Sequence, residues 1–222
     1  MTHPAAGPMG IFGGTFDPIH YGHLRTAFEL VQALQLPEMR FMPAGNPPHR
    51  EITVAGNAQR LEMVRVATAG QPEFTVDDRE MRKSGPSYTV ETLSELRHES
   101  PQRPLCLIVG MDAFLGLPRW HRWRDLLTLA HLVVAHRPGW RAPGTGALGE
   151  LIAQHGTHRV ADLHDSVAGR IYIHAVTQLE ISSTEVRNLI GAGRDPRYLM
   201  PEGVRQIIHD SGCYARKDLA KE

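Results

Sequence analysis

Two histidines stand three residues apart where a glycine-rich turn leads into a predicted helix, an arrangement that suits a polyphosphate. They are His20 and His23 in the segment GGTFDPIHYGH, residues 13–23. Apolar residues after them recur at three- and four-residue steps, which predicts a helix from about Ile19 with both imidazoles on one face. The unpaired N–H groups and the positive dipole end of a helix start favour an anion. We therefore expect a phosphate site here.

Half of a zinc site is the alternative interpretation of such a histidine pair. A zinc site needs further cysteine, histidine or carboxylate ligands at a recognisable spacing. The two cysteines, Cys106 and Cys213, lie far apart and form no CxxC pair. His155 and His158 repeat the histidine spacing without a strand-to-helix junction, so we assign them to a surface loop. These observations weaken the metal interpretation.

A second helix start suited to phosphate lies near the end of the chain. Ser182 and Glu185 have the spacing of a capping box, directly after an apolar predicted strand. Ser183 and Thr184 add hydroxyl groups, and Arg187 adds a guanidinium that can bind phosphate oxygens bidentately. A plain helix cap with a surface arginine is the alternative. Two such helix starts in one chain favour the phosphate site.

These two segments carry a resemblance. GTFDPIHYGH resembles the GxFxPxHxGH signature of the nucleotidylyltransferase superfamily, and ISSTEVR at 181–187 resembles its ISSTxxR element. With the segments PAGNPPHR, SYTVETL, GMDAF and LPRWHRW, the chain is similar to the bacterial nicotinate-nucleotide adenylyltransferase family over nearly its whole length. The resemblance implies adenylyl transfer from ATP to nicotinate mononucleotide, which yields nicotinate adenine dinucleotide and pyrophosphate in NAD biosynthesis. It also implies Mg²⁺ on the triphosphate.

The resemblance further implies which residues form the site. Those implied in catalysis are His20, His23 and Arg187. Those implied to bind ATP are Gly13, Gly14, Thr15, Phe16, His20, His23, Gly110, Asp112, Ser182, Ser183, Thr184 and Arg187. Those implied to bind the acceptor are His49, Arg50, Ser87, Tyr88, Thr89, Trp120 and His121. We expect Trp123 in the core.

Residue types alone also allow purely structural roles for these segments. Ser87 and Thr89 are ordinary helix-start residues, and Asp112 could cap the helix after a strand. Trp120 has a helical spacing that is more often found in a core. An adenylyltransferase for another acceptor, such as phosphopantetheine or nicotinamide mononucleotide, is the alternative function. A non-catalytic nucleotide-binding regulator and a metal-storage protein using the 13 histidines are more distant alternatives.

Length and charge are those of an ordinary globular chain. The 222 residues fit one domain, with flexible segments expected at 1–8 and 137–149. Lys and Arg together equal Asp and Glu at 24 each, so nothing indicates a nucleic-acid partner. No signal-peptide pattern is present, and no apolar run reaches the roughly 20 residues of a membrane span. We expect a cytoplasmic protein without a membrane partner, and homo-oligomer formation stays open.

Short apolar runs alternate with helical patterns, which predicts a Rossmann-like, doubly wound α/β fold. Such a fold has a mainly parallel sheet with helices on both faces and its ligand crevice at the carboxyl ends of the strands. A small helical part at the C-terminus ends with a helix from Pro201 to about Gly212. Strands are predicted near 9–12, 39–42, 74–76, 105–109, 132–135 and 171–174, and helices near 20–34, 57–69, 87–98 and 119–129.

Overall fold

A single parallel sheet organises the chain. In this computed structural model, residues 7–46, 53–136, 139, 142–177 and 179–215 are described. The sheet has seven strands in the order β3-β2-β1-β4-β5-β7-β6, and every pairing is parallel. The strands are β1 (Met9–Gly14), β2 (Glu38–Pro43), β3 (Phe74–Val76), β4 (Leu105–Gly110), β5 (His131–His136), β6 (Gly156–Thr157) and β7 (Ile171–Ala175). The six predicted strands are confirmed, and β6 was not predicted because two residues leave no periodic pattern.

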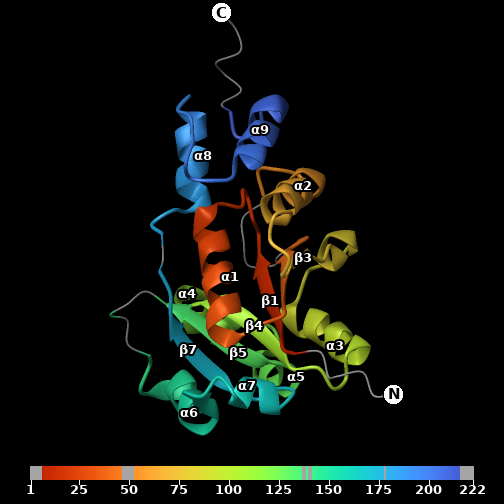
Figure 1. Cartoon of the computed structure of the whole chain (residues 1–222), viewed down its shortest axis with the longest axis vertical. Helices are drawn as coiled ribbons and strands as arrows, with labels where there is room; N and C mark the ends of the chain where they lie inside the picture. The colour runs from red at the N-terminus through yellow and green to blue at the C-terminus, as the bar shows by residue number, and fades with distance from the viewer. Residues whose placement is uncertain (1–6, 47–52, 137–138, 140–141, 178, 216–222) are drawn as a thin grey trace, which may run out of the picture.

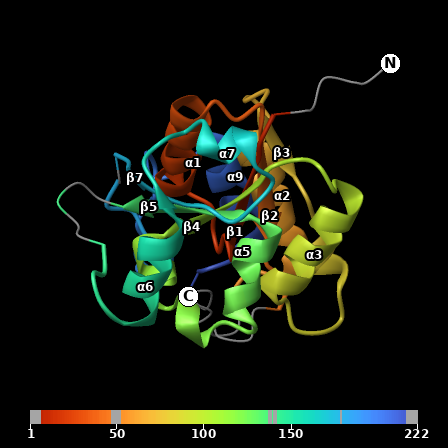
Figure 2. The same cartoon turned by 90° about the horizontal axis from the view of Figure 1, so that it is seen from below.

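Helices cover both faces of this sheet, as Figure 2 shows in the view from below. They are α1 (Tyr21–Leu34), α2 (Asn57–Thr68), α3 (Thr89–Glu99), α4 (Met111–Leu115), α5 (Leu126–Leu129), α6 (Gly146–His155), α7 (Asp162–Asp165), α8 (Ser183–Gly191) and α9 (Glu202–Ser211). Three short 3₁₀ turns are η1 (Arg79–Arg82), η2 (Leu117–Arg119) and η3 (Trp123–Asp125).

The two faces of β4 illustrate why the sheet is buried. Cys106 and Ile108 belong to one core cluster, which also holds apolar residues of α1, α2, α8 and α9. Leu105, Leu107 and Val109 belong to a second cluster with residues of α3, α4 and α5. Successive side chains of a strand point to opposite faces, so a continuous apolar run fits a strand with a core on each side. The predicted doubly wound α/β fold is confirmed.

The C-terminal helices α8 and α9 stand at one end of the molecule, beyond the start of α1 (Figure 1). Val204 and Ile208 of α9 are buried in the same cluster as Met63 and Val64 of α2. The last helix begins at Glu202, one residue later than predicted. It ends before Gly212, whose φ of 64° places it in the left-handed region that glycine tolerates.

Two predicted segments are wrong. The helix expected at 119–129 is divided into η2, an extended residue at Trp120, η3 and α5, because Arg122 adopts a left-handed backbone with φ of 49°. The loop expected at 137–149 ends earlier, because α6 already begins at Gly146 and buries Leu148. Most of the flexible segment expected at 1–8 lies outside the described residues.

Candidate active site

A cleft of about 1110 Å³ opens at the carboxyl ends of β1 and β4. Its walls come from the loop between β1 and α1, the segment before α3, the turn after β4 and the start of α8. All the site residues expected from the sequence line it, except His49 and Arg50, which lie outside the described residues. The lining residues among them are Gly13, Gly14, Thr15, Phe16, His20, His23, Ser87, Tyr88, Thr89, Gly110, Asp112, Trp120, His121, Ser182, Ser183, Thr184 and Arg187.

The histidine pair lies at the start of α1, which begins at Tyr21 rather than near Ile19. The His20 backbone N–H donates to Nδ1 of His23 at 3.3 Å, and the two ring centroids are 3.8 Å apart. His20 is only 5% exposed, and burial lowers its pKa to about 4. The His20 ring is therefore a neutral hydrogen-bonding group at neutral pH. Its Nδ1 has no hydrogen-bond partner among the described residues.

The start of α8 lies against the same loop. The predicted cap is confirmed in that Ser182 Oγ accepts the Glu185 backbone N–H at 3.1 Å. Ser183 Oγ donates to the Pro18 carbonyl at 2.9 Å. Arg187 Nη1 donates to the Asp17 carbonyl at 2.7 Å, across 170 residues of chain. The histidine pair and the arginine therefore meet at one cleft.

Asp17 is a buried member of this loop that the sequence analysis did not select. Its carboxylate accepts the backbone N–H groups of Val54 and Ala55 at 2.9 and 3.1 Å. It also accepts the hydroxyl of Tyr214 at 2.7 Å. These partners lie 37 to 197 residues away, so no local spacing could have indicated them.

Arg60 of α2 is the second residue that sequence analysis missed. It is fully buried, and its Nη1 donates to the Thr15 carbonyl at 2.6 Å. Its Nη2 donates to Asn57 Oδ1 at 2.7 Å and to the Gly45 carbonyl at 3.4 Å. Burial lowers the pKa of this guanidinium. One side chain therefore joins the loop after β1 to the loop after β2, behind the cleft.

The loop after β2 and the segment before α3 are joined directly. The Ser87 backbone N–H donates to the Asn46 carbonyl at 3.0 Å, and the Asn46 N–H donates to Ser87 Oγ at 3.4 Å. A Cβ at Gly45 would overlap the carbonyl oxygen of Glu80, so only glycine fits there. Across this part of the cleft, the ring of Tyr88 lies 4.5 Å from that of His121.

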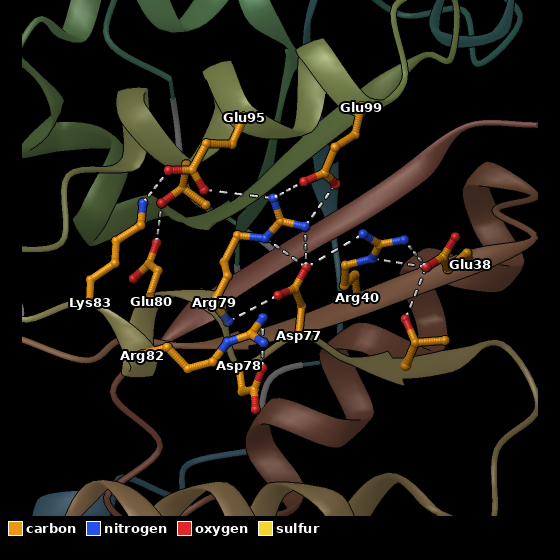
Figure 3. Close-up of polar contacts among 12 residues, drawn as sticks. Glu38, Arg40, Asp77, Asp78, Arg79, Glu80, Arg82, Lys83, Glu95 and Glu99 are labelled. Atoms are coloured by element: carbon orange, nitrogen blue, oxygen red, sulfur yellow. Dashed lines mark hydrogen bonds and ion pairs between the residues drawn. The ribbon is translucent and has the colours of Figure 1, made fainter.

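Glu80, on η1, also lines the cleft and was not predicted. Its buried carboxylate accepts the Thr92 hydroxyl at 2.8 Å, and burial raises its pKa. Figure 3 shows that Arg79 and Lys83, close to Glu80 in the chain, form ion pairs with acidic residues. Arg79 lies 2.8 Å from both Asp77 and Glu99, and Lys83 lies 2.6 Å from Glu95. The pairs with Glu95 and Glu99 attach this segment to α3.

The turn after β4 completes the wall. Asp112 is exposed in the first turn of α4, directly after Gly110. Trp120 is half-buried at the cleft. Trp123 is buried in the second core cluster, with Arg124 4.4 Å above its ring, which confirms its expected place in the core.

Comparisons with known proteins identify the family of this chain. The model of the cytidylyltransferase-like family matches residues 11–189. A probable nicotinate-nucleotide adenylyltransferase of Aeromonas hydrophila is 51% identical over 207 residues, which is 93% of this chain and 97% of that protein. One of Halorhodospira halophila is 50% identical over 211 residues, 95% and 97% of the two chains. The chain belongs to the nicotinate-nucleotide adenylyltransferase family.

A solved adenylyltransferase has the same fold. The nicotinic acid mononucleotide adenylyltransferase of Plasmodium falciparum, complexed with NaAD, superposes with a TM-score of 0.73 over 94% of this chain and 97% of that one. The two sequences are 15% identical. The likeness therefore establishes the fold of this family member, while the sequence relatives establish the family.

Neither a cluster of metal ligands nor a membrane-spanning helix occurs among the described residues. Within the ranges that the structure describes, no three His, Cys, Asp or Glu side chains are grouped as metal ligands. Among the same residues no helix is long and apolar enough to cross a membrane.

His155, expected in a loop, is instead the last residue of α6, where its Nδ1 bonds the Gly169 carbonyl at 3.0 Å.

Proposed function

We propose that this chain transfers the adenylyl group of ATP to nicotinate mononucleotide, which gives nicotinate adenine dinucleotide and pyrophosphate. One observation carries the proposal. The cleft joins the histidine pair and Arg187 on one side to the segment 87–89 and the turn at 120–121 on the other. Two anionic substrates can therefore lie side by side. The names of the relatives at about half identity support the same reaction.

In this reaction a phosphate oxygen of the acceptor attacks the α-phosphorus of ATP. The new P–O bond forms as the bond to the leaving pyrophosphate breaks, so no protein nucleophile takes part. The protein contributes by holding the two substrates in line and by stabilising charge that moves toward pyrophosphate. His20 and His23 supply ring nitrogens for hydrogen bonds, and Arg187 supplies a permanent positive charge.

The ATP side of the proposed site consists of the glycine-rich loop after β1, the start of α1, the turn after β4 and the start of α8. The helix starts add backbone N–H groups and positive dipole ends. Ser183 uses its hydroxyl to hold Pro18. We therefore assign the phosphate contact at this position to the backbone of α8 rather than to the Ser183 hydroxyl.

We propose that Mg²⁺ enters as part of the ATP substrate. Asp17 and Glu80 line the cleft, but their carboxylates already accept several hydrogen bonds. Asp112 is exposed at the cleft. Mg²⁺ commonly keeps several waters and binds substrate phosphates with only one or two carboxylates, so this donor set suits a nucleotide-borne ion.

The test compares acceptors at a fixed concentration of Mg²⁺ and ATP. Purified protein is incubated with nicotinate mononucleotide, nicotinamide mononucleotide or phosphopantetheine, and both the adenylylated product and pyrophosphate are quantified. We expect the highest kcat/KM with nicotinate mononucleotide. ATP binding without turnover on this acceptor would instead support the regulator, and faster turnover on phosphopantetheine would contradict the proposed acceptor.

A further inference from the structure

The C-terminal end of the described chain reaches the loop between β1 and α1. Tyr214 follows α9 and is buried at 8% exposure. Its hydroxyl donates to Asp17 Oδ1 at 2.7 Å, across 197 residues of sequence. No sequence motif of the site includes this tyrosine.

The backbone at Tyr214 is held in an unusual conformation. Its φ is 73°, in the left-handed region that a residue with a bulky side chain rarely adopts. Such a conformation persists where surrounding contacts over-determine it. Here the preceding turn at Gly212 and the burial of the ring in the core cluster of α9 direct the hydroxyl to the carboxylate.

Asp17 is where three parts of the cleft meet. Through its carboxylate it holds the N–H groups of residues 54 and 55, and through its carbonyl it holds Arg187. Arg187 Nη1 lies 4.0 Å from Asp17 Oδ2, farther than a hydrogen bond, and this oxygen accepts the Val54 N–H. Arg187 thus bonds the backbone of Asp17, while the Tyr214 hydroxyl and the Ala55 N–H bind the other carboxylate oxygen, Oδ1.

We propose that Tyr214 is a positioning residue for adenylyl transfer, which keeps the Arg187 guanidinium at the cleft by occupying the Asp17 carboxylate with its hydroxyl. The inference rests on the proposed function, because it assigns Arg187 to the phosphates of ATP. Without the hydroxyl, a buried anion lacks one donor, and an unmet buried acceptor is costly. Arg187 is the nearest charged donor and moves toward the carboxylate, away from ATP.

The hydroxyl suits this task across the working pH range. Burial and the adjacent Asp17 carboxylate raise the pKa of Tyr214. The phenol therefore stays protonated and donates throughout.

The experiment replaces only the hydroxyl. In Tyr214→Phe, we expect kcat/KM for ATP to fall by about tenfold, the order expected for one lost hydrogen bond to a charged group. The KM for nicotinate mononucleotide should change less than twofold. The control is Tyr198→Phe, since Tyr198 is also a tyrosine with a left-handed backbone, φ 71°, but is 83% exposed. It should match the wild type.

A double-mutant cycle then tests the route through Arg187. If Tyr214 acts by positioning this arginine, the Phe substitution should cost little in an Arg187→Lys background, since the guanidinium to be positioned is already gone. An equal cost in both backgrounds would overturn the inference. So would a Tyr214→Phe protein with wild-type kcat/KM for ATP.

ATP affinity, measured by calorimetry without acceptor, separates this inference from the proposed function. All variants are compared at a temperature where thermal melts show them folded. If the wild type forms no dinucleotide, the proposed function fails, while the Tyr214–Arg187 coupling is still decided by ATP affinity. We expect ATP to bind Tyr214→Phe about tenfold more weakly than the wild type. Unchanged ATP affinity in this variant would contradict the inference.

Discussion

The buried imidazole of His20 predicts a loss of stability in acid. Burial lowers its pKa from 6.5 to about 4, because desolvation disfavours the charged form. In the unfolded chain the imidazole has an ordinary pKa of about 6.5. Between these values the unfolded chain binds a proton that the folded chain does not. The free energy of unfolding therefore falls as the pH falls from about 6.5 through about 4.

The magnitude follows from the two pKa values. A fall from 6.5 to about 4 corresponds to about 3 kcal/mol of lost stability once the pH is below both values, at about 1.4 kcal/mol for each tenfold change in proton affinity. The side chain is only 5% exposed, so solvent screening reduces this amount little. Above pH 6.5, His20 contributes no pH dependence to stability.

Urea denaturation from pH 7 to pH 4 measures the effect. His20→Gln should lack this contribution, so its free energy of unfolding should fall by about 3 kcal/mol less than that of the wild type. His158→Gln is the control, because that histidine is exposed outside the cleft and should leave the curve unchanged. Parallel curves for the wild type and His20→Gln would refute the reasoning. In an NMR titration, added ATP should raise the pKa of His20, because phosphate charge favours the protonated ring.

Three further predictions concern the cleft. His23→Ala should lower turnover by about two to three orders of magnitude in pyrophosphate release, and a near-normal rate would remove His23 from the mechanism. Arg60→Met should lower the free energy of unfolding, measured by urea denaturation, by about 2–4 kcal/mol, because two backbone carbonyls lose a charged donor. An unchanged or higher stability would mean that removing a buried charge outweighs the loss of these hydrogen bonds. Glu80→Ala should raise the KM for the acceptor by about tenfold, because the bond to Thr92 is lost. The control Glu91→Ala, on the exposed face of α3, should leave this KM unchanged. If only the KM for ATP rose, Glu80 would belong to the ATP side of the cleft instead.

Sequence reasoning succeeded where the controlling interactions are local. The apolar runs of β1 and β4, the cap at Ser182 and the glycine turn before α1 depend on neighbours within a few residues. The carboxyl ends of parallel strands meet at one edge of a sheet. For this reason the motifs could be expected to line one cleft before any distance was known.

The remainder depends on contacts between distant residues. Arg60 has the appearance of an ordinary helix cation, and only its bond to Thr15, 45 residues away, connects it to the cleft. Glu80 stands in a charged run that would normally face solvent, yet its carboxylate is buried and accepts the hydroxyl of Thr92, 12 residues away. The predicted helix is interrupted at Arg122, whose left-handed backbone lies within a segment of helical composition. None of these could be predicted from spacing.

Because α8 lies against the loop between β1 and α1, a nucleotide bound to both segments would act as a non-covalent cross-link between them. Ser183 and Arg187 bond carbonyls 165 and 170 residues earlier in the chain, so ATP held as proposed would tie together segments that enclose most of the sheet. A ligand present at a hundred times its Kd adds about 2.7 kcal/mol to the stability of the form that binds it. Substrate saturation would thus protect the C-terminal helices from proteolysis as well as prepare the reaction.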